Sequence, residues 1–248
     1  MKFSERIKNY KVEKSFALFF MGQAGFIIKD KQGLLYAFDV YLTDCCEREF
    51  GFKRLMPKIL LPEDAEFDYV FTTHDHFDHY DIDAMPILMA NSKCKLVTTP
   101  MGKTLAEKQG FGDRTSVLTC GQTISVGNIS VTAVSCDHGE LAKDALGFVI
   151  QIEDKKIYLV GDSAFHKEMA QDKGEIDVLF VPINGAFGNM NEEEAFSFTQ
   201  TLKPKTVVPC HYGNFKEHGG NVNNFIRHFA NVKDIELLVL NIGDIVEF

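Results

Sequence analysis

Thr73-His74-Asp75-His76-Phe77-Asp78-His79 contains three imidazoles and two carboxylates within six consecutive positions. Neutral imidazole nitrogens and carboxylate oxygens are ligands that zinc, manganese and iron accept. His74 and His76 are two residues apart, so in an extended backbone they point to the same side and can share one ion. Asp78 and His79 follow as the chain turns, and can reach a second ion nearby. The alternative is a polar loop with accidental histidines, but three of the chain's eight histidines fall here.

The residues on either side of this stretch predict a loop between a strand and a helix. Residues 67–72 are apolar, aromatic and β-branched, as in a buried strand. Residues 85–90 are apolar and follow Asp81 and Asp83, which are suitable helix caps. Strand-and-helix folds usually place their chemistry in such loops.

The pattern His74-x-His76-x-Asp78-His79 resembles the signature of the metallo-β-lactamase superfamily. That family adds a later His, Asp and His at strand ends, and His138, Asp162 and His211 each follow an apolar, strand-like run. The resemblance implies two divalent metal ions, Zn²⁺ or Mn²⁺. It assigns His74, His76 and His138 to the first ion, Asp78, His79 and His211 to the second, and Asp162 to both. It also implies that Asp78 is the catalytic acid/base and that Asp39 orients a ligand histidine, although Asp39 can equally be an acidic turn residue.

The order of predicted elements fits one domain, residues 1–248, of the α/β (α+β) class. The resemblance implies a four-layer αββα sandwich of two mixed sheets with outer helices. Residues 1–14 read as a polar lead-in, 164–171 as a helix and 237–240 as a strand. Asn191, with Glu194 three residues later, predicts a capped helix that runs to about residue 202.

Within the superfamily the chain resembles the L-ascorbate-6-phosphate lactonase group and related metal-dependent hydrolases. Gly22-Gln23-Ala24-Gly25, Asp39 with a long insertion after it, and Gly161-Asp162-Ser163 carry this resemblance, together with residues 182–190 and 209–213. It implies a metal-dependent hydrolase that acts on a lactone or related ester. Two alternatives stay open: a phosphodiesterase or nuclease of the same superfamily, and a metal-binding protein without catalysis.

Candidate substrate contacts come from loops at the same predicted sheet edge. Asn184 and Tyr212 each follow a predicted strand and can hold a carbonyl or leaving oxygen. The irregular insertion, residues 40–66, is either a cover over the metal site or a surface packing loop. Its Arg48, Lys53 and Arg54 can meet a phosphate or carboxylate of the substrate, or can be solvated loop charges.

The composition of the chain limits the classes of molecule that it is expected to bind. The formal charge of −9 argues against nucleic acid, so we expect a small-molecule substrate, which can be anionic because metals supply local positive charge. No signal-peptide core or membrane-length apolar run is present, which predicts a cytoplasmic protein without a membrane partner; an oligomer stays open. The six cysteines read as reduced thiols, and Cys136 and Cys210 read as small strand residues rather than as metal ligands. His166, His218 and His228 match no motif and are expected at the surface.

Overall fold

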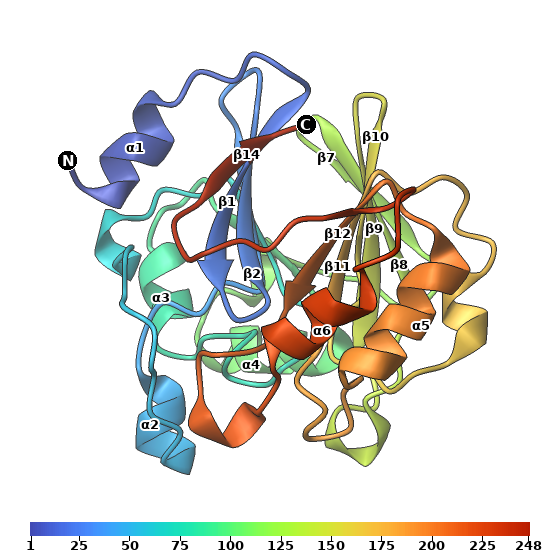
Figure 1. Ribbon diagram of the computed structural model, residues 1–248. Helices are drawn as coiled ribbons and strands as arrows, with labels where there is room; N and C mark the ends of the chain where they lie inside the picture. Colours follow the sequence, from blue (N-terminus) through green and yellow to red (C-terminus); the bar gives the residue numbers. More distant parts are fainter. The chain divides into compact units, whose positions relative to one another are not determined.

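The chain forms two compact units in a computed structural model that describes residues 1–248 (Figure 1). Unit 1 is Met1–Thr119 with Asn241–Phe248, and unit 2 is Cys120–Leu240. Each unit contains one mixed sheet of seven strands and its own helices. The assignment of residues 1–248 to a single domain stays a prediction.

The sheet of unit 1 has the strand order β14-β1-β2-β3-β4-β5-β6. The three ladders from β14 to β3 are antiparallel and the three from β3 to β6 are parallel. Its strands are β1 (Phe16–Gly22), β2 (Gly25–Asp30), β3 (Leu35–Phe38), β4 (Tyr69–Phe71), β5 (Lys95–Thr98), β6 (Thr115–Val117) and β14 (Ile245–Glu247). The His-rich stretch therefore follows a strand, β4, as its sequence predicts, and this strand pairs parallel with both of its neighbours.

The helices of unit 1 include two that the sequence analysis missed, one near residue 1 and one within the insertion over residues 40–66. They are α1 (Phe3–Asn9), α2 (Cys45–Phe50), α3 (Ala84–Leu88) and α4 (Pro100–Lys108), with short 3₁₀ turns η1 (Pro62–Asp64) and η2 (Gly112–Arg114). The prediction of a polar lead-in over residues 1–14 is wrong for α1. Phe3 and Ile7 are four residues apart, so they share one face of a helix, and both are buried. Lys29 Nζ donates to three carbonyls at or just beyond the end of α1, which satisfies groups that a helix end leaves open.

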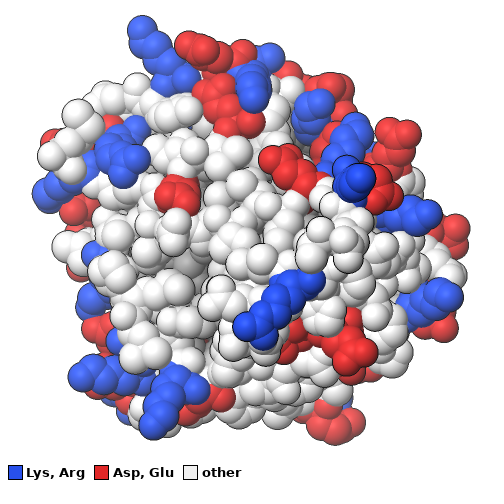
Figure 2. Space-filling view, in the orientation of Figure 1, with Lys and Arg blue, Asp and Glu red and all other residues white.

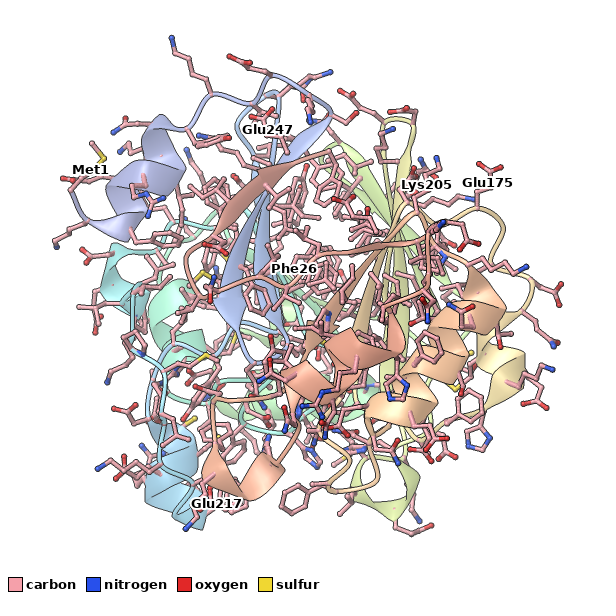
Figure 3. All side chains as sticks on the ribbon, viewed as in Figure 1. Met1, Phe26, Glu175, Lys205, Glu217 and Glu247 are labelled. Atoms are coloured by element: carbon pink, nitrogen blue, oxygen red, sulfur yellow. The ribbon has the colours of Figure 1, made fainter.

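Both faces of the unit 1 sheet are buried. On one face α1, α3 and α4 pack against alternate strand residues such as Phe19, Ile27 and Leu96. On the other face the rings of Phe26, Phe38 and Phe71 stack across three neighbouring strands, with centroids 5.1 and 4.6 Å apart. Phe26 lies among other side chains in Figure 3, whereas Glu247 lies at the periphery.

The sheet of unit 2 has the order β13-β12-β11-β10-β9-β8-β7. Its ladders repeat the pattern of unit 1, because β7 to β10 pair antiparallel and β10 to β13 pair parallel. The strands are β7 (Thr123–Val126), β8 (Ile129–Ser135), β9 (Leu146–Ile152), β10 (Lys155–Leu159), β11 (Val178–Pro182), β12 (Thr206–Cys210) and β13 (Glu236–Leu237). The predicted strand over 237–240 is therefore wrong in extent: Leu238 N still donates to Val207 O, and the chain then leaves the sheet.

The helices of unit 2 cover one face of its sheet. They are α5 (Glu192–Leu202) and α6 (Val222–His228), with 3₁₀ turns η3 (Gly139–Leu141), η4 (Lys167–Ala170) and η5 (Lys216–His218). Phe198 of α5 and Phe225 of α6 join the buried cluster on that face. Asn191 caps α5 through the predicted capping box. None of the helices in the chain combines the length and the apolar character that crossing a bilayer requires.

The predicted helix over residues 164–171 is wrong. Only the single turn η4 forms there, because the start of the segment bonds to a neighbouring loop instead. Ala164 N donates to Asp137 O, and His166 Nε2 contacts Asp137 Oδ2. These bonds replace the first turn of a helix and tie the segment after Asp162 to the segment before His138.

Candidate metal centre

Unit 1 gathers four of the predicted ligands in the loop between β4 and α3. His74 and His79 are fully buried, and Asp78 is 8% exposed. The ring of His74 has its centroid 4.6 Å from that of His76 and 4.1 Å from that of His79. His79 N and Tyr80 N both donate to His76 O, which closes the loop into a tight turn. The three closely spaced histidines of the sequence thus form a compact group of imidazole rings.

Asp39 fixes the back of this loop. It follows β3 with φ 45°, and its Oδ1 accepts from Thr73 N at 2.8 Å. Its Oδ2 accepts from Thr73 Oγ1 at 2.6 Å and lies 2.8 Å from His79 Nδ1. A carboxylate only accepts, so this contact places the ring proton of His79 on Nδ1 and directs the Nε2 lone pair to the other side of the ring. Nε2 lies 3.7 Å from Asp78 Oδ2, as two ligands of one ion would.

Gln23 orients Asp78, a role that the sequence analysis did not identify. Its Nε2 donates to Asp78 Oδ2 at 2.8 Å, and Gln23 is 2% exposed. The turn that carries Gln23 lies against Asp39: a Cβ on Gly25 would stand 2.8 Å from Asp39 O, so only glycine fits there. The sequence showed the small-residue turn, but its contact with the His-rich loop depends on sheet pairing.

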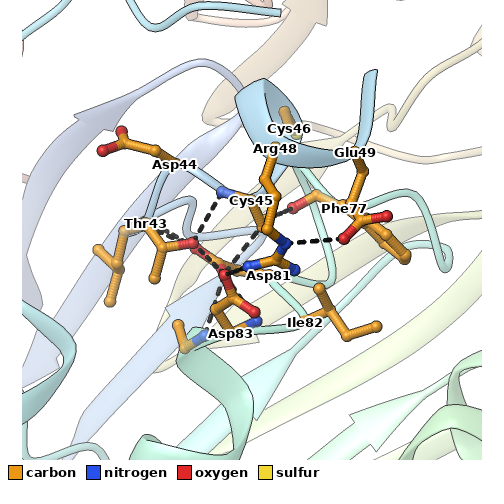
Figure 4. Close-up of polar contacts among 12 residues, drawn as sticks. Thr43, Asp44, Cys45, Cys46, Arg48, Glu49, Phe77, Asp81, Ile82 and Asp83 are labelled. Carbon is orange, nitrogen blue, oxygen red and sulfur yellow. Dashed lines mark hydrogen bonds and ion pairs between the residues drawn. The ribbon is translucent and has the colours of Figure 1, made fainter. Parts of the chain in front are cut away.

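Asp81 joins the insertion to the His-rich loop (Figure 4). Its buried carboxylate accepts from Leu42 N, Thr43 N and Thr43 Oγ1 at 2.6–2.8 Å, and from Ala84 N at 3.0 Å. The last bond makes Asp81 a cap of α3, as predicted, whereas Asp83 makes no side-chain cap bond. Cys45 Sγ also contacts Asp81 Oδ1 and Phe77 O at 3.4 and 3.5 Å. One carboxylate therefore holds α2 against the loop.

Unit 2 brings together its three predicted ligands from three different strand ends. His138, Asp162 and His211 are 3%, 4% and 1% exposed. Asp162 Oδ2 lies 3.0 Å from His211 Nε2 and 3.8 Å from His138 Nε2. The chain before Asp162 passes close to β9, because a Cβ on Gly161 would stand 2.7 Å from Leu146 O. His211 itself has φ 60°, a left-handed conformation that is uncommon outside glycine and concentrates at functional sites.

Asn189 holds Asp162, and the sequence analysis did not single it out. Asn189 Nδ2 donates to Asp162 Oδ2 at 2.9 Å, and Asn189 is 6% exposed. Cys136 Sγ donates to the backbone oxygen of Asp162 at 2.9 Å. That bond gives Cys136, which lies just after β8 rather than within it, a supporting role in the loop, whereas Cys210 is a buried residue of β12.

His218 corrects the expectation that the three remaining histidines lie at the surface. His166 and His228 are exposed, but His218 is 5% exposed. Its ring stacks on that of His211, with centroids 4.9 Å apart and planes inclined by 5°. The ring centroids of Phe215 and Phe187 lie 4.8 and 5.4 Å from that of His218, and both rings meet it edge to face. Only the position of His218, seven residues after His211, could have indicated this contact.

The predicted substrate contacts fall into two groups. Asn184 and Tyr212 both pack around Gly220, where a Cβ would stand 3.1 Å from Asn184 Cα and 2.8 Å from Tyr212 Cβ. Asn184 donates to Ala186 O, and burial raises the pKa of Tyr212 to about 12, so its phenol stays protonated.

The three cations lie in unit 1 and differ in their surroundings. Lys53 is exposed, whereas Arg48 is paired with Asp83 and Glu49. The Arg54 side chain is 7% exposed and donates to Tyr41 O and Thr43 O. Its guanidinium carbon lies 4.1 Å from the centroid of the Tyr41 ring. The contacts of Arg54 therefore hold the insertion together.

The residues of both units fit metal ions. Each unit carries imidazole nitrogens and carboxylate oxygens of the kind that can hold a metal ion, most of them buried. Buried carboxylates and imidazoles at such density are costly without a positive charge nearby, and N/O donors suit zinc and manganese. The Asp39–His79 contact adds the outer hydrogen bond that ligating histidines usually make.

Comparison with known proteins gives a family for this fold and donor set. Residues 40–212 match the model of the beta-lactamase superfamily domain. A UPF0173 metal-dependent hydrolase of Natranaerobius thermophilus is 31% identical over 186 residues, which cover 74% of this chain and 82% of that protein. A UPF0173 metal-dependent hydrolase of Anaeromyxobacter sp. is 30% identical over 217 residues, 80% and 75% of the two chains.

A solved structure shows the fold. Igni18, a metallo hydrolase from Ignicoccus hospitalis, has a TM-score of 0.77 and 21% identity, with 93% of this chain and 97% of that chain covered. The predicted fold class, two mixed sheets with flanking helices in an α/β sandwich, is confirmed.

Proposed function

The chain belongs to the metallo-β-lactamase superfamily, and from that premise we propose that it is a metal-dependent hydrolase with two ions held by ligands from both units. His74, His76 and His138 would hold the first ion, Asp78, His79 and His211 would hold the second, and Asp162 would bind both. The observation that carries this proposal is the Asp39–His79–Asp78 arrangement, because it prepares one imidazole nitrogen beside one carboxylate.

Two divalent ions would polarise an oxygen of the substrate and lower the pKa of a water molecule to about 7. The chain's own groups complete the reaction. Asp78, oriented by Gln23, takes a proton from the attacking water and returns it to the leaving group. Asn189 holds the Asp162 carboxylate in place, and His218 fixes the plane of the His211 ring.

The substrate that we propose is a small molecule with a lactone or related ester bond. Asn184 and Tyr212 are the candidates to hold its carbonyl or leaving oxygen, because an amide N–H and a phenol O–H can both donate to it. Basic and acidic side chains intermingle on the face shown in Figure 2, which supports a small molecule rather than a polyphosphate chain. The six free cysteines support a reducing compartment such as the cytoplasm.

A metal analysis followed by a substrate screen tests the proposal. The protein is purified without chelator, its metal content is measured, and a chelated sample is reloaded with Zn²⁺ or Mn²⁺. We expect two ions per chain and metal-dependent cleavage within a panel of lactones, esters, thioesters and phosphodiesters. Cleavage of phosphodiesters alone would favour the nuclease or phosphodiesterase alternative. Two bound ions with no cleavage at all would favour a metal-binding protein without catalysis.

A further inference from the structure

Three phenylalanine rings form an exposed aromatic surface on unit 1, which we call the aromatic shelf: Phe50, Phe52 and Phe77. Phe50, the last residue of α2, has its ring centroid 5.5 Å from that of Phe77 and 6.1 Å from that of Phe52. Phe50 is 57% exposed, and the other two are partly exposed. Phe77 lies between His76 and Asp78, so one end of the shelf is part of the His-rich loop itself.

Hydrogen bonds fix the segments that carry the rings of the aromatic shelf. Asp81 accepts hydrogen bonds from Leu42 and Thr43, just before α2, and contacts Cys45 Sγ within it (Figure 4). Cys45 Sγ also reaches the carbonyl of Phe77, which links the two sides of the shelf directly. Gly51, with φ 76°, ends α2 in a left-handed turn, and Phe52 follows directly after this turn. The exposure of Phe50 is therefore a property of a fixed segment.

Charge around the shelf is already compensated. The guanidinium of Arg48, two residues before Phe50, is paired with Asp83 and Glu49. Arg54 is directed to backbone carbonyls and Asp44. Of Arg48, Lys53 and Arg54, only Lys53 is exposed without such pairing. Exposed rings beside paired charges favour an apolar ligand over an anionic one.

We propose that the aromatic shelf binds an apolar aryl or alkyl group of the substrate, next to the bond that is cleaved. The inference deepens the proposed function and rests on it, because the shelf adjoins the metal centre only if the His-rich loop holds metal. It names the substrate class as esters or lactones that carry an apolar group within a few atoms of the scissile bond. The occupant is a small molecule, since the shelf is built from three side chains of two adjacent segments.

A homologous series of substrates tests this inference. The metal-loaded protein is assayed on esters whose acyl group lengthens from acetyl to butanoyl, hexanoyl and phenylacetyl, and on a second series in which the alcohol part lengthens. Each methylene that the shelf covers should raise kcat/KM by about two- to fourfold in one series, since full burial of a methylene corresponds to about fourfold. Phe50→Ala should flatten this slope, and Phe50→Leu should restore part of it. Ile226→Ala, which removes an exposed apolar side chain on α6, is the matched control and should keep the slope.

A binding measurement gives a readout besides activity. The chain contains no tryptophan, so Phe50→Trp introduces a single indole at the shelf. Hexanoate or phenylacetate should shift its emission to the blue at lower concentration than acetate does. A shift in emission without any slope in either kinetic series would place apolar binding away from the reacting bond and overturn the inference.

The remaining outcomes separate the two proposals. Cleavage with a flat slope in both series, unchanged by Phe50→Ala, overturns the inference and leaves the proposed hydrolase intact. No cleavage of any panel member by protein with two ions overturns both. Light scattering after size-exclusion chromatography adds a third case: if Phe50→Ala dissociates an oligomer and the slope is unchanged, the shelf is an interface between copies of this chain and the inference is wrong.

Discussion

The two units share one strand arrangement but use an aspartate at the same point in opposite ways. In each sheet three antiparallel ladders are followed by three parallel ones, and an aspartate comes after the strand where the pattern changes, Asp39 after β3 and Asp162 after β10. Asp39 lies 2.8 Å from Nδ1 of His79, whereas Asp162 lies 3.0 Å from Nε2 of His211. The first contact orients a ligand from behind, and the second puts the carboxylate among the proposed ligands. The imidazole nitrogen that faces the aspartate therefore decides its role.

The units also differ in how their ligands are assembled. Unit 1 presents four ligands from one short loop, supported by Asp39 and Asp81. Unit 2 presents one ligand after each of β8, β10 and β12, so their distances depend on the register of the sheet. Losing one ligand in unit 1 leaves three neighbours on a loop with its own hydrogen bonds. Losing Asp162 removes the residue on which the other two ligands of unit 2 converge.

Asp162→Ala should have the largest effect. A bridging carboxylate serves both ions, so we expect both to be lost or weakened and hydrolysis to fall on the order of 10³-fold or more, since the ions supply several kcal/mol to the transition state. Metal analysis and turnover are measured on the same preparation. Retention of two ions and full activity would show that Asp162 does not bridge.

Asp78→Asn should reduce turnover while it spares metal more. The change keeps the shape of the side chain but removes the anionic acceptor, so we expect a loss of about 10²–10⁴-fold, the usual contribution of a placed acid or base. Metal content should fall less than activity. Equal loss of both would mean that Asp78 is a ligand only.

A feature of the fold or of the site could be predicted from sequence when the residues that form it are close together along the chain. The His-rich loop was predictable because its ligands and their spacing are local, and the strand before it is strongly apolar. The cap at Asn191 was predictable for the same reason. The first helix was not predicted, although Phe3 and Ile7 have helical spacing, because that signal consists of two residues in a polar segment.

The supporting residues could not be predicted, because their partners are remote in sequence. Gln23 and Asp78 are 55 positions apart, and Asn189 and Asp162 are 27 positions apart. Asparagine is common in turns and glutamine is usually an exposed polar residue, so nothing in their local pattern marks these two. Only sheet pairing, which sequence periodicity does not fix, brings each one to its carboxylate.

The supporting hydrogen bonds of the two units can be compared directly. Asp39→Asn should weaken metal affinity by about 10- to 100-fold, the usual effect of losing the outer partner of a ligand histidine. Asn189→Leu removes the donor to Asp162 and should cost at the lower end of that range, because a neutral donor contributes less than a carboxylate that fixes the proton on His79. Competition with a chelator measures both affinities. A larger loss of metal affinity in Asn189→Leu than in Asp39→Asn would contradict the expectation that Asp39 is the more important of the two supporting residues.

The smallest expected effects concern one helix cap in each unit. Asn191→Ala removes a cap that accepts from Glu193 N and Glu194 N at 3.0 Å, and should lower the free energy of unfolding by about 1 kcal/mol. Thr99→Ala removes a longer bond, 3.3 Å to Gly102 N, and should cost less, about 0.5 kcal/mol. Urea denaturation of the chelated protein measures both, so that metal binding does not mask the difference. Because neither cap contacts a proposed ligand, metal affinity should stay unchanged in both variants; a loss of metal in Asn191→Ala would show that α5 positions Asn189 and that unit 2 is less tolerant of distant change than unit 1.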